Sequence, residues 1–186
     1  MRILVAMEYS GRVREAFRAK GHNVTSCDLL PSEDNSPHHV VGDVIPLIDQ
    51  GGWDLIVMHP PCTALAVSGN RWYGTGKEKH SERLESIAWT LMVFEKAQRN
   101  AKAVCMENPV GVLPIKATQY VQPWEYGCGE TKKTGLWLAG LEPLTPTDIV
   151  DGREQRVWRM GPSPDRWKER SRTFQGIAYA MAAQWG

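Results

Sequence analysis

Two short segments of the sequence place a reactive side chain on a stiff stretch of backbone: His59-Pro60-Pro61-Cys62 and Glu107-Asn108-Pro109. A cysteine held behind two prolines suits a nucleophile that must stay at a set distance from its target. A glutamate at the end of a strand can bind a ring nitrogen and an exocyclic amine of a pyrimidine together. We therefore predict covalent chemistry in which Cys62 is the nucleophile and Glu107 orients or protonates the substrate.

Short apolar runs and helical patterns indicate the elements that must position these residues. The apolar runs, which predict buried parallel strands, lie at residues 3–6, 24–27, 55–58 and 103–106. Apolar residues at helical spacing predict helices over residues 13–20 and 82–99. Because strand and helix alternate, we expect an α/β fold with a doubly wound, mostly parallel, Rossmann-like sheet. Ligands of such sheets bind at the carboxyl ends of the strands, where both reactive segments would lie.

The last third of the chain has a different pattern. Two further strand patterns, at residues 121–126 and 134–138, are separated by a loop rich in glycine and lysine and predict an antiparallel hairpin at one edge of the sheet. Residues 141–172 contain several prolines and little periodicity, so we expect mostly loop. Residues 173–185 are predicted to close the chain as an amphipathic helix.

Polar residues and a small-residue turn follow the other predicted strands. Glu8-Tyr9-Ser10-Gly11 follows the first strand, and a tight turn there lets the backbone approach a ligand. Asp28 follows the second strand, where a carboxylate can accept hydrogen bonds from ribose hydroxyls, and Asp43 lies in the stretch before the third. These positions predict a cofactor pocket beside the two reactive segments. Each residue could equally serve a turn or a helix cap.

Length and composition favour one globular domain without a membrane span. The chain has 186 residues, of which 42% are hydrophobic and 23% charged, and it shows neither a long apolar stretch nor a signal-peptide pattern. We therefore expect a cytoplasmic protein. The four cysteines are widely spaced without a CxxC pair and the five histidines are scattered, so we expect free thiols and no bound metal.

The charge pattern leaves a nucleic-acid partner open. The formal net charge is only +1, but basic residues gather between residues 151 and 172, interleaved with Trp158 and Trp167. This segment could bind a phosphate backbone, or it could be a solvated loop whose long side chains cover apolar surface.

The order of these motifs resembles that of the DNA cytosine-5 methyltransferases over nearly the whole chain. His59-Pro60-Pro61-Cys62 is similar to the Pro-Cys nucleophile motif of this family, and Glu107-Asn108-Pro109 is similar to its Glu-Asn motif. The resemblance implies a small phage- or bacterial-type member with one catalytic domain over residues 1–186. It also implies S-adenosylmethionine as cofactor, with contacts from Glu8, Tyr9, Ser10, Gly11, Asp28, Leu29, Asp43 and Pro60.

The same resemblance implies a reaction and a substrate. The Cys62 thiolate would add to C6 of a cytosine in DNA, Glu107 would protonate or bind N3, and C5 would then accept the methyl group. We expect Asn108 to support the loop of Glu107. A duplex substrate, the expected partner, would need its cytosine flipped out at a cost of about a few kcal/mol. The residues implied to contact the substrate are Pro61, Arg71, Lys132 and Lys133.

The sequence departs from the family pattern in several places. Residues 141–172 leave room only for a reduced target-recognition region before the closing helix. The family's Gln-x-Arg-x-Arg pattern is absent, and Thr131-Lys132-Lys133 stands near its place with a positive charge. The second glycine of the cofactor turn is replaced in Ser10-Gly11-Arg12-Val13, and Gly176-Ile177-Ala178 lacks the asparagine of the last motif.

Three alternatives remain open from the sequence. The same cysteine chemistry could act on RNA, on a free cytosine nucleotide, or with a modified one-carbon donor. A catalytically inactive, methyltransferase-like protein could bind nucleic acid without reaction. A dehydrogenase-type nucleotide-binding domain is the remaining alternative, although the full glycine fingerprint is absent after the first strand. The sequence leaves the oligomeric state undetermined.

Overall fold

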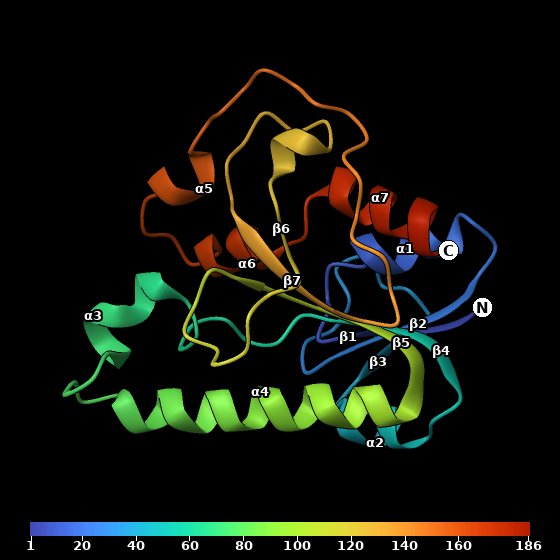
Figure 1. Ribbon diagram of the computed structural model, residues 1–186, viewed down its shortest axis with the longest axis horizontal. Helices are drawn as coiled ribbons and strands as arrows, with labels where there is room; N and C mark the ends of the chain where they lie inside the picture. The colour runs from blue at the N-terminus through green and yellow to red at the C-terminus, as the bar shows by residue number, and fades with distance from the viewer.

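The computed structural model has a seven-stranded sheet at its centre, in the order β3-β2-β1-β4-β5-β7-β6 (Figure 1). It describes residues 1–186 apart from the side chain of Trp158. The strands are β1 (Arg2–Ala6), β2 (Asn23–Asp28), β3 (His39–Val41), β4 (Trp53–Met58), β5 (Ala101–Pro109), β6 (Gln119–Val121) and β7 (Thr134–Ala139). The pairs from β3 to β5 are parallel, and β7 runs antiparallel to both β5 and β6. The predicted mostly parallel sheet with an antiparallel edge is confirmed.

The register of the central parallel strands determines which residues meet at the edge of the sheet. One row across the sheet consists of Cys27, Ala6, Met58 and Met106. The residues that follow this row in β2, β4 and β5 are Asp28, His59 and Glu107. Polar groups from distant parts of the sequence therefore meet at the carboxyl ends of the parallel strands.

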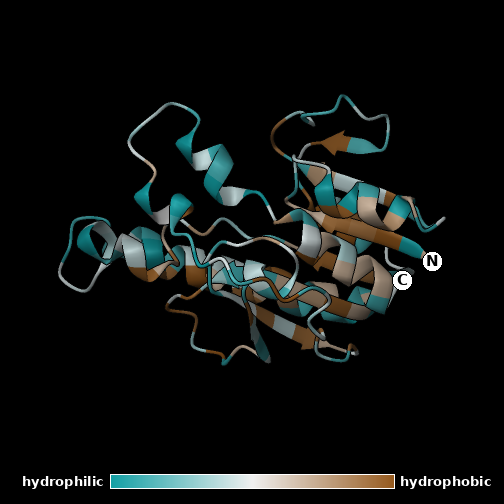
Figure 2. Ribbon diagram, turned by 90° about the horizontal axis from the view of Figure 1, so that it is seen from above, coloured by the Kyte–Doolittle hydropathy of each residue, from teal (hydrophilic) through white to brown (hydrophobic). Residues whose placement is uncertain are grey.

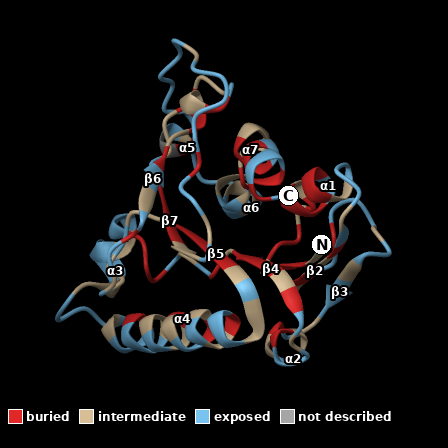
Figure 3. Cartoon of the chain, turned by 45° about the vertical axis from the view of Figure 1, so that its right-hand side comes forward, coloured by how far each residue is buried: buried red, intermediate tan, exposed pale blue. Residues whose placement is uncertain are grey.

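Helices cover both faces of the sheet, as a doubly wound fold requires (Figures 1 and 3). On one face lie α1 (Arg12–Arg18) and α7 (Gln175–Trp185), and on the other lie α2 (Ile45–Asp49) and α4 (His80–Asn100). The strands are mostly hydrophobic, whereas the surface helices and loops carry more hydrophilic residues (Figure 2). A strand covered on both sides buries successive residues in opposite cores, which explains the continuous apolar runs of the sequence.

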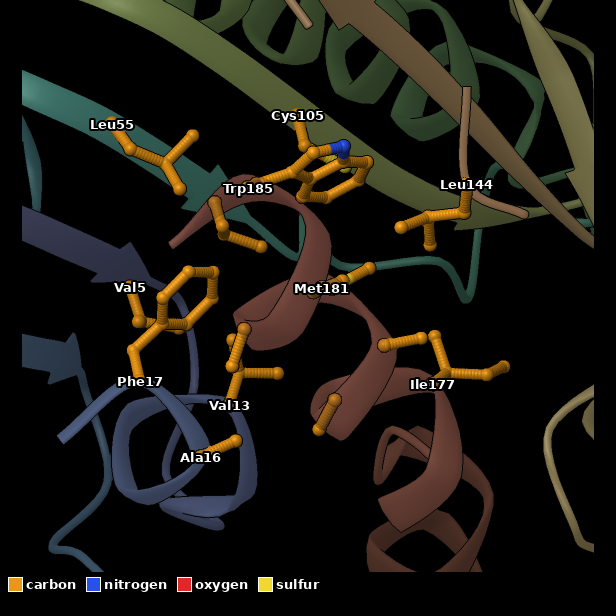
Figure 4. Packing of buried hydrophobic residues seen from close by; sticks show 14 of the residues in the cluster. Val5, Val13, Ala16, Phe17, Leu55, Cys105, Leu144, Ile177, Met181 and Trp185 are labelled. Carbon is orange, nitrogen blue, oxygen red and sulfur yellow. The ribbon is translucent and has the colours of Figure 1, made fainter. Parts of the chain in front are cut away.

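The core between the sheet and the α1–α7 pair is built from interlocking large side chains. Phe17 from α1 and Met181 and Trp185 from α7 pack with Val5 and Leu55 of the sheet (Figure 4). Burying one such side chain stabilises the fold by about 1.5–3 kcal/mol. The predicted amphipathic closing helix is thus confirmed as a structural part of the core.

Several local predictions were wrong. The helix predicted at residues 82–99 is α4, but it buries Arg83, Thr90 and Val93, whereas Leu84 of the apolar pattern is 55% exposed. The strands β3 and β6 and the helix α2 are each too short to produce a readable pattern. The first hairpin strand ends at β6, and residues 123–125 form the 3-10 turn η2 (Pro123–Glu125), because proline lacks the N–H of a strand ladder.

The segment expected to be mostly loop contains two helical turns. They are α5 (Arg156–Arg159) and α6 (Arg166–Ser171), and two further short helices, η1 (Val67–Gly69) and α3 (Asn70–Tyr73), follow Cys62. Among the described residues, no helix is both long and apolar enough to cross a membrane.

Gly176, in the last sequence motif, is required by a close approach of two backbones. A Cβ atom at this position would lie 1.7 Å from the carbonyl oxygen of Tyr126. We expect Gly176→Ala to lower the free energy of unfolding by about 1–3 kcal/mol, because α7 would have to move away from its neighbour. Urea unfolding should show this loss. Gly161→Ala is the control, since nothing lies within 4 Å of a Cβ there, and equal stability of both variants would contradict the prediction.

Candidate active site

The polar residues at the carboxyl ends of the strands line one cavity of about 1110 Å³. A ligand is expected at this place in an open α/β sheet. The volume exceeds the 300–1,000 Å³ of an ordinary small-molecule pocket, so two ligands could lie side by side. The predicted site residues that line it are Glu8, Tyr9, Ser10, Asp28, Leu29, Asp43, Pro60, Pro61, Cys62, Glu107, Asn108 and Lys132.

Three predicted site residues do not line this cavity. Gly11 is the N-cap of α1 with φ +73°, a left-handed conformation that favours glycine. Arg71 is exposed on α3, where its guanidinium lies 5.2 Å from the ring centre of Trp72. Lys133 is exposed, with its ammonium 4.5 Å from the ring centre of Tyr120.

Cys62 is half-buried in the loop that follows β4, and contacts at both ends hold this loop. The Cys62 carbonyl accepts hydrogen bonds from the N–H groups of Leu65 (3.1 Å) and Ala66 (2.8 Å). Before the cysteine, the Pro60 carbonyl accepts a 2.8 Å hydrogen bond from Nδ2 of Asn108. Since β5 lies beside β4, the end of β5 reaches across to the neighbouring loop. Asn108, which was expected to support the loop of Glu107, therefore joins that loop to the loop of Cys62.

The thiol of Cys62 is protonated in the resting protein. Burial raises its pKa, and the negative charge of Glu107 raises it further, while the positive charge of Lys132 lowers it. A thiolate can therefore form only when the charges in the cavity change, as when a ligand enters.

Glu107 forms a buried pair with His59. Nδ1 of His59 lies 2.9 Å from Oε2 of Glu107, and the two side chains are only 10% and 9% exposed. Burial would raise the pKa of Glu107, but the hydrogen bond to His59 and the charges of Lys132 and His59 lower it overall. Burial likewise opposes a charge on His59, yet the hydrogen bond and charge of Glu107 raise the pKa of this histidine above its usual value. Both shifts favour the form of the pair in which His59 is an imidazolium and Glu107 is a carboxylate.

Glu8, which also lines the cavity, caps the first helix. Its Oε1 accepts a 2.7 Å hydrogen bond from the N–H of Val13, and its Oε2 accepts one of 3.3 Å from Arg14. A dinucleotide fold presents these helix N–H groups to a pyrophosphate. Here a carboxylate takes that place and would repel a phosphate, which argues against the dehydrogenase alternative.

Asp28 and Asp43 combine a turn with a place in the cavity wall. Oδ1 of Asp28 accepts the N–H of Leu30 at 3.0 Å, and Oδ1 of Asp43 accepts that of Ile45 at 2.9 Å. Burial raises the pKa of Asp28 more than its hydrogen bonds lower it. A carboxylate offers about four acceptor positions, so each of these residues retains capacity for a ligand.

Residues between 157 and 172 contribute part of the cavity lining. The Tyr9 hydroxyl donates to the Lys168 carbonyl at 3.1 Å and lies 2.9 Å from Oγ of Ser171. The ring of Tyr9 is 5.9 Å from that of Trp167. The N-terminal turn is thereby joined to α6, about 160 positions later in the sequence.

The two sides of the cavity differ in charge. Glu8, Asp28, Asp43 and Glu107 come from the ends of strands or the turns after them, whereas Lys132, Arg166, Arg170 and Arg172 come from the hairpin loop and from α6 and its end. Arg172 is already paired with Glu33 at 2.5 Å, and Lys132 donates to the Arg170 carbonyl at 2.9 Å. The acidic side suits a cationic ligand, and the basic side suits one that carries phosphate.

Sequence reasoning missed His59 and the residues of α6 that line the cavity. His59 stood in the reactive segment, directly before Pro60. Its position directly after a predicted strand could have indicated that it lies in the site. Arg166, Trp167 and Arg170 lay in the basic segment, but their place in the cavity lining depends on long-range packing without a local pattern.

Comparison with known proteins gives the fold. No protein-family model and no curated protein matches the sequence. The Entamoeba histolytica methyltransferase EhMeth is similar in structure, with a TM-score of 0.53, 11% identity and coverage of 88% of this chain and 60% of that one. A mutant of Spodoptera frugiperda DNMT2 gives a TM-score of 0.46, 16% identity and coverage of 83% and 54%. The chain thus spans little more than half the length of these two proteins. The likeness to EhMeth shows that the chain has the α/β fold of a methyltransferase.

Proposed function

We propose that this chain transfers a methyl group from S-adenosylmethionine to C5 of cytosine in DNA, with Cys62 as nucleophile. The observation that carries the proposal is the single cavity in which Cys62 and Glu107 meet Tyr9, Asp28 and Asp43. The likeness of the fold to that of a methyltransferase supports it. In this proposal residues 1–186 act as one catalytic domain, and residues 141–172 serve as a reduced recognition segment.

The acidic side of the cavity fits the proposed cofactor. S-adenosylmethionine, when bound, supplies an electrophilic methyl group on a positively charged sulfur. Asp28 and Asp43 would accept hydrogen bonds from its hydroxyl and amine groups, with further contacts from the segment Glu8–Gly11, Leu29 and Pro60. The carboxylate of Glu8 at the helix end disfavours donors that carry phosphate and is compatible with a cation.

The remaining groups of the cavity fit an attack on cytosine. Cys62 would release its proton to water, and its sulfur would bond to C6 while the C5–C6 electrons shift toward C5. N3 would receive a proton through Glu107, which favours the carboxylate form at rest and must first take that proton from its surroundings. After methylation, water would take the C5 proton, the S–C6 bond would break, and N3 would return its proton. Lys132 favours the thiolate by its charge, and Asn108 fixes the loop of Cys62.

The basic side of the cavity fits a polynucleotide. A cytosine in duplex DNA must leave the base stack to reach Cys62, and phosphates beside it would be bound by positive side chains. Lys132 is within the cavity, whereas Arg71 and Lys133 lie outside it, where they could contact the flanking strand. Pro61 would pack on the substrate beside the nucleophile.

Transfer of a labelled methyl group tests the proposal. Purified protein is incubated with S-adenosylmethionine labelled in its methyl group and, in parallel, with duplex DNA, single-stranded DNA, RNA or deoxycytidine nucleotides. We expect the label at C5 of cytosine in DNA after digestion of the product. Label only in RNA or nucleotides would overturn the substrate, and no transfer to any of them would overturn the proposed activity.

Asp28 provides a separate test of the cofactor side. We expect Asp28→Ala to weaken binding of S-adenosylmethionine about 10- to 100-fold, since a hydrogen bond to a charged group contributes about 1.5–3 kcal/mol. Isothermal titration calorimetry measures this change without any substrate. Asp49→Ala is the control, because this exposed residue pairs with Lys96 on α4. Equal affinity in Asp28→Ala and wild type would remove Asp28 from the cofactor site.

A further inference from the structure

His59 has the surroundings of a functional histidine. It directly follows β4, its Nδ1 contacts Glu107 at 2.9 Å, and its Nε2 is buried without a hydrogen-bond partner among the described residues. A buried ion pair contributes little net stability compared with apolar side chains of similar volume. A buried polar atom without a partner also costs free energy. Stability therefore gives no reason for a histidine at this position.

We propose that His59 is the proton partner of Glu107, holding the proton that Glu107 delivers to N3 of the target cytosine when Cys62 adds to C6. This inference rests on the proposed function and extends it to a residue that would not touch the substrate. His59 is thus a positioning residue that acts through the carboxyl group of Glu107.

The proton balance of the step is simple. As the S–C6 bond forms, the proton on Nδ1 of His59 moves to Oε2 of Glu107, and the carboxyl group gives a proton to N3. The imidazole is then neutral. The net result is that His59 has lost one proton and N3 has gained one. When the S–C6 bond breaks, N3 returns its proton to Glu107, and Nδ1 recovers its own. No oxidant, reductant or further reactant is needed.

The charges around His59 support its role as the residue that holds the proton for Glu107. Glu107 of β5 and Glu8, which follows β1, favour the imidazolium, whereas burial and the charge of Lys132 before β7 oppose it. Asp28, at the end of β2, also interacts with the charge of His59. The acids prevail, so the pKa of His59 is raised. His59 is therefore protonated below this raised pKa, and it loses its proton as the pH rises through it.

His59→Asn tests the inference, because the amide nitrogen of asparagine can replace Nδ1 as a donor to Glu107 but cannot carry an exchangeable charge. We expect kcat at pH 6.5, where a histidine with a raised pKa is mostly protonated, to fall about 10- to 100-fold, with little change in KM for S-adenosylmethionine. Without the imidazolium, burial raises the pKa of Glu107, which must then carry the proton alone. In His59→Asn, the decrease of kcat with rising pH should consequently follow the pKa of Glu107. Part of the activity lost in the variant should be recovered at lower pH.

A histidine that only stabilises the fold would behave differently. Its loss would lower kcat by the same factor at every pH, together with the melting temperature. His38→Asn, an exposed histidine, is the matched control and should leave the profile unchanged. Wild-type kcat or an unshifted pH profile in His59→Asn would overturn the inference while leaving the proposed function intact.

A second measurement is independent of turnover. NMR titration of the ring nitrogens, with His59 assigned by the loss of its signals in His59→Asn, should show a lower His59 pKa in Glu107→Gln than in wild type. An unchanged titration would overturn the pairing of the two residues. Absence of methyl transfer by the wild type would overturn both the proposed function and proton delivery, even if the titration showed coupling.

Discussion

Replacing Cys62 by serine should lower kcat for methyl transfer at least about 1000-fold. The variant keeps the size and place of the side chain, but a hydroxyl is a far weaker nucleophile than a thiolate, and the covalent route through C6 is lost. Residual activity could arise only because the site still binds both substrates side by side. Other enzymes whose nucleophile has been removed retain activity in this way. Cofactor affinity should change little, because the variant leaves Asp28 and Asp43 unchanged.

Cys128→Ser is the matched control for this prediction. Cys128 is also a half-buried free cysteine, but it does not line the cavity. It should retain wild-type turnover. If Cys62→Ser kept more than about a tenth of the activity, the covalent mechanism would be wrong, whatever the position of the methyl group in the product.

Replacing Glu107 by glutamine should lower kcat about 100- to 10,000-fold, the usual range for loss of a proton-transferring group. Glutamine preserves the volume and can still hydrogen-bond His59, but it cannot deliver a proton to N3. Without that proton, the negative charge that develops on the ring during attack by Cys62 has no acid to neutralise it. Single-turnover kinetics with saturating DNA and cofactor would separate this chemical defect from any change in binding.

The stability of the Glu107→Gln variant serves as an internal check. Glutamine can still hydrogen-bond His59, and His59 can lose its proton so that no unpaired charge remains buried. The melting temperature should therefore change much less than the activity. Glu95→Gln is the control for removing one acid, because Glu95 is exposed on α4 and pairs with Arg99. A Glu107→Gln variant with near-normal kcat would contradict a role of this carboxyl group in protonation.

The positions of Cys62 and Glu107 could be predicted because they depend on sequence-local signals. Each follows an apolar run that had to be a buried strand, and parallel strands bring their carboxyl ends together. The register that aligns Met58 with Met106 then places both segments at one edge. The fold class, and the meeting of these two segments at one edge of the sheet, could therefore be predicted from the amino-acid sequence.

The contacts within the cavity could not be predicted in the same way. The His59–Glu107 pair joins residues 48 positions apart, and the contact of Tyr9 with α6 spans about 160 positions. No periodicity encodes such pairs. The turns of α5 and α6 were missed because each has only four to six residues and depends on packing over the cavity.

The structure adds contacts and positions that the resemblance did not specify. Asn108 was expected to support the loop of Glu107, and its side chain donates a hydrogen bond to the carbonyl of Pro60 in the neighbouring loop. Gly11, Arg71 and Lys133 matched positions of a pattern, yet they lie outside the cavity. A motif specifies the order of residues along the chain. Which atoms each side chain contacts depends on how the neighbouring strands are arranged.

The most direct test of the central claim is trapping of the covalent intermediate. Protein, S-adenosylmethionine and a DNA duplex containing 5-fluorocytosine are mixed, and the product is analysed by denaturing mass spectrometry and peptide mapping. Fluorine at C5 cannot leave as a cation, so the S–C6 bond should persist after methylation. We predict an adduct of one methylated oligonucleotide on the peptide that contains Cys62. Methylation of ordinary cytosine at C5 without any such adduct would contradict the account.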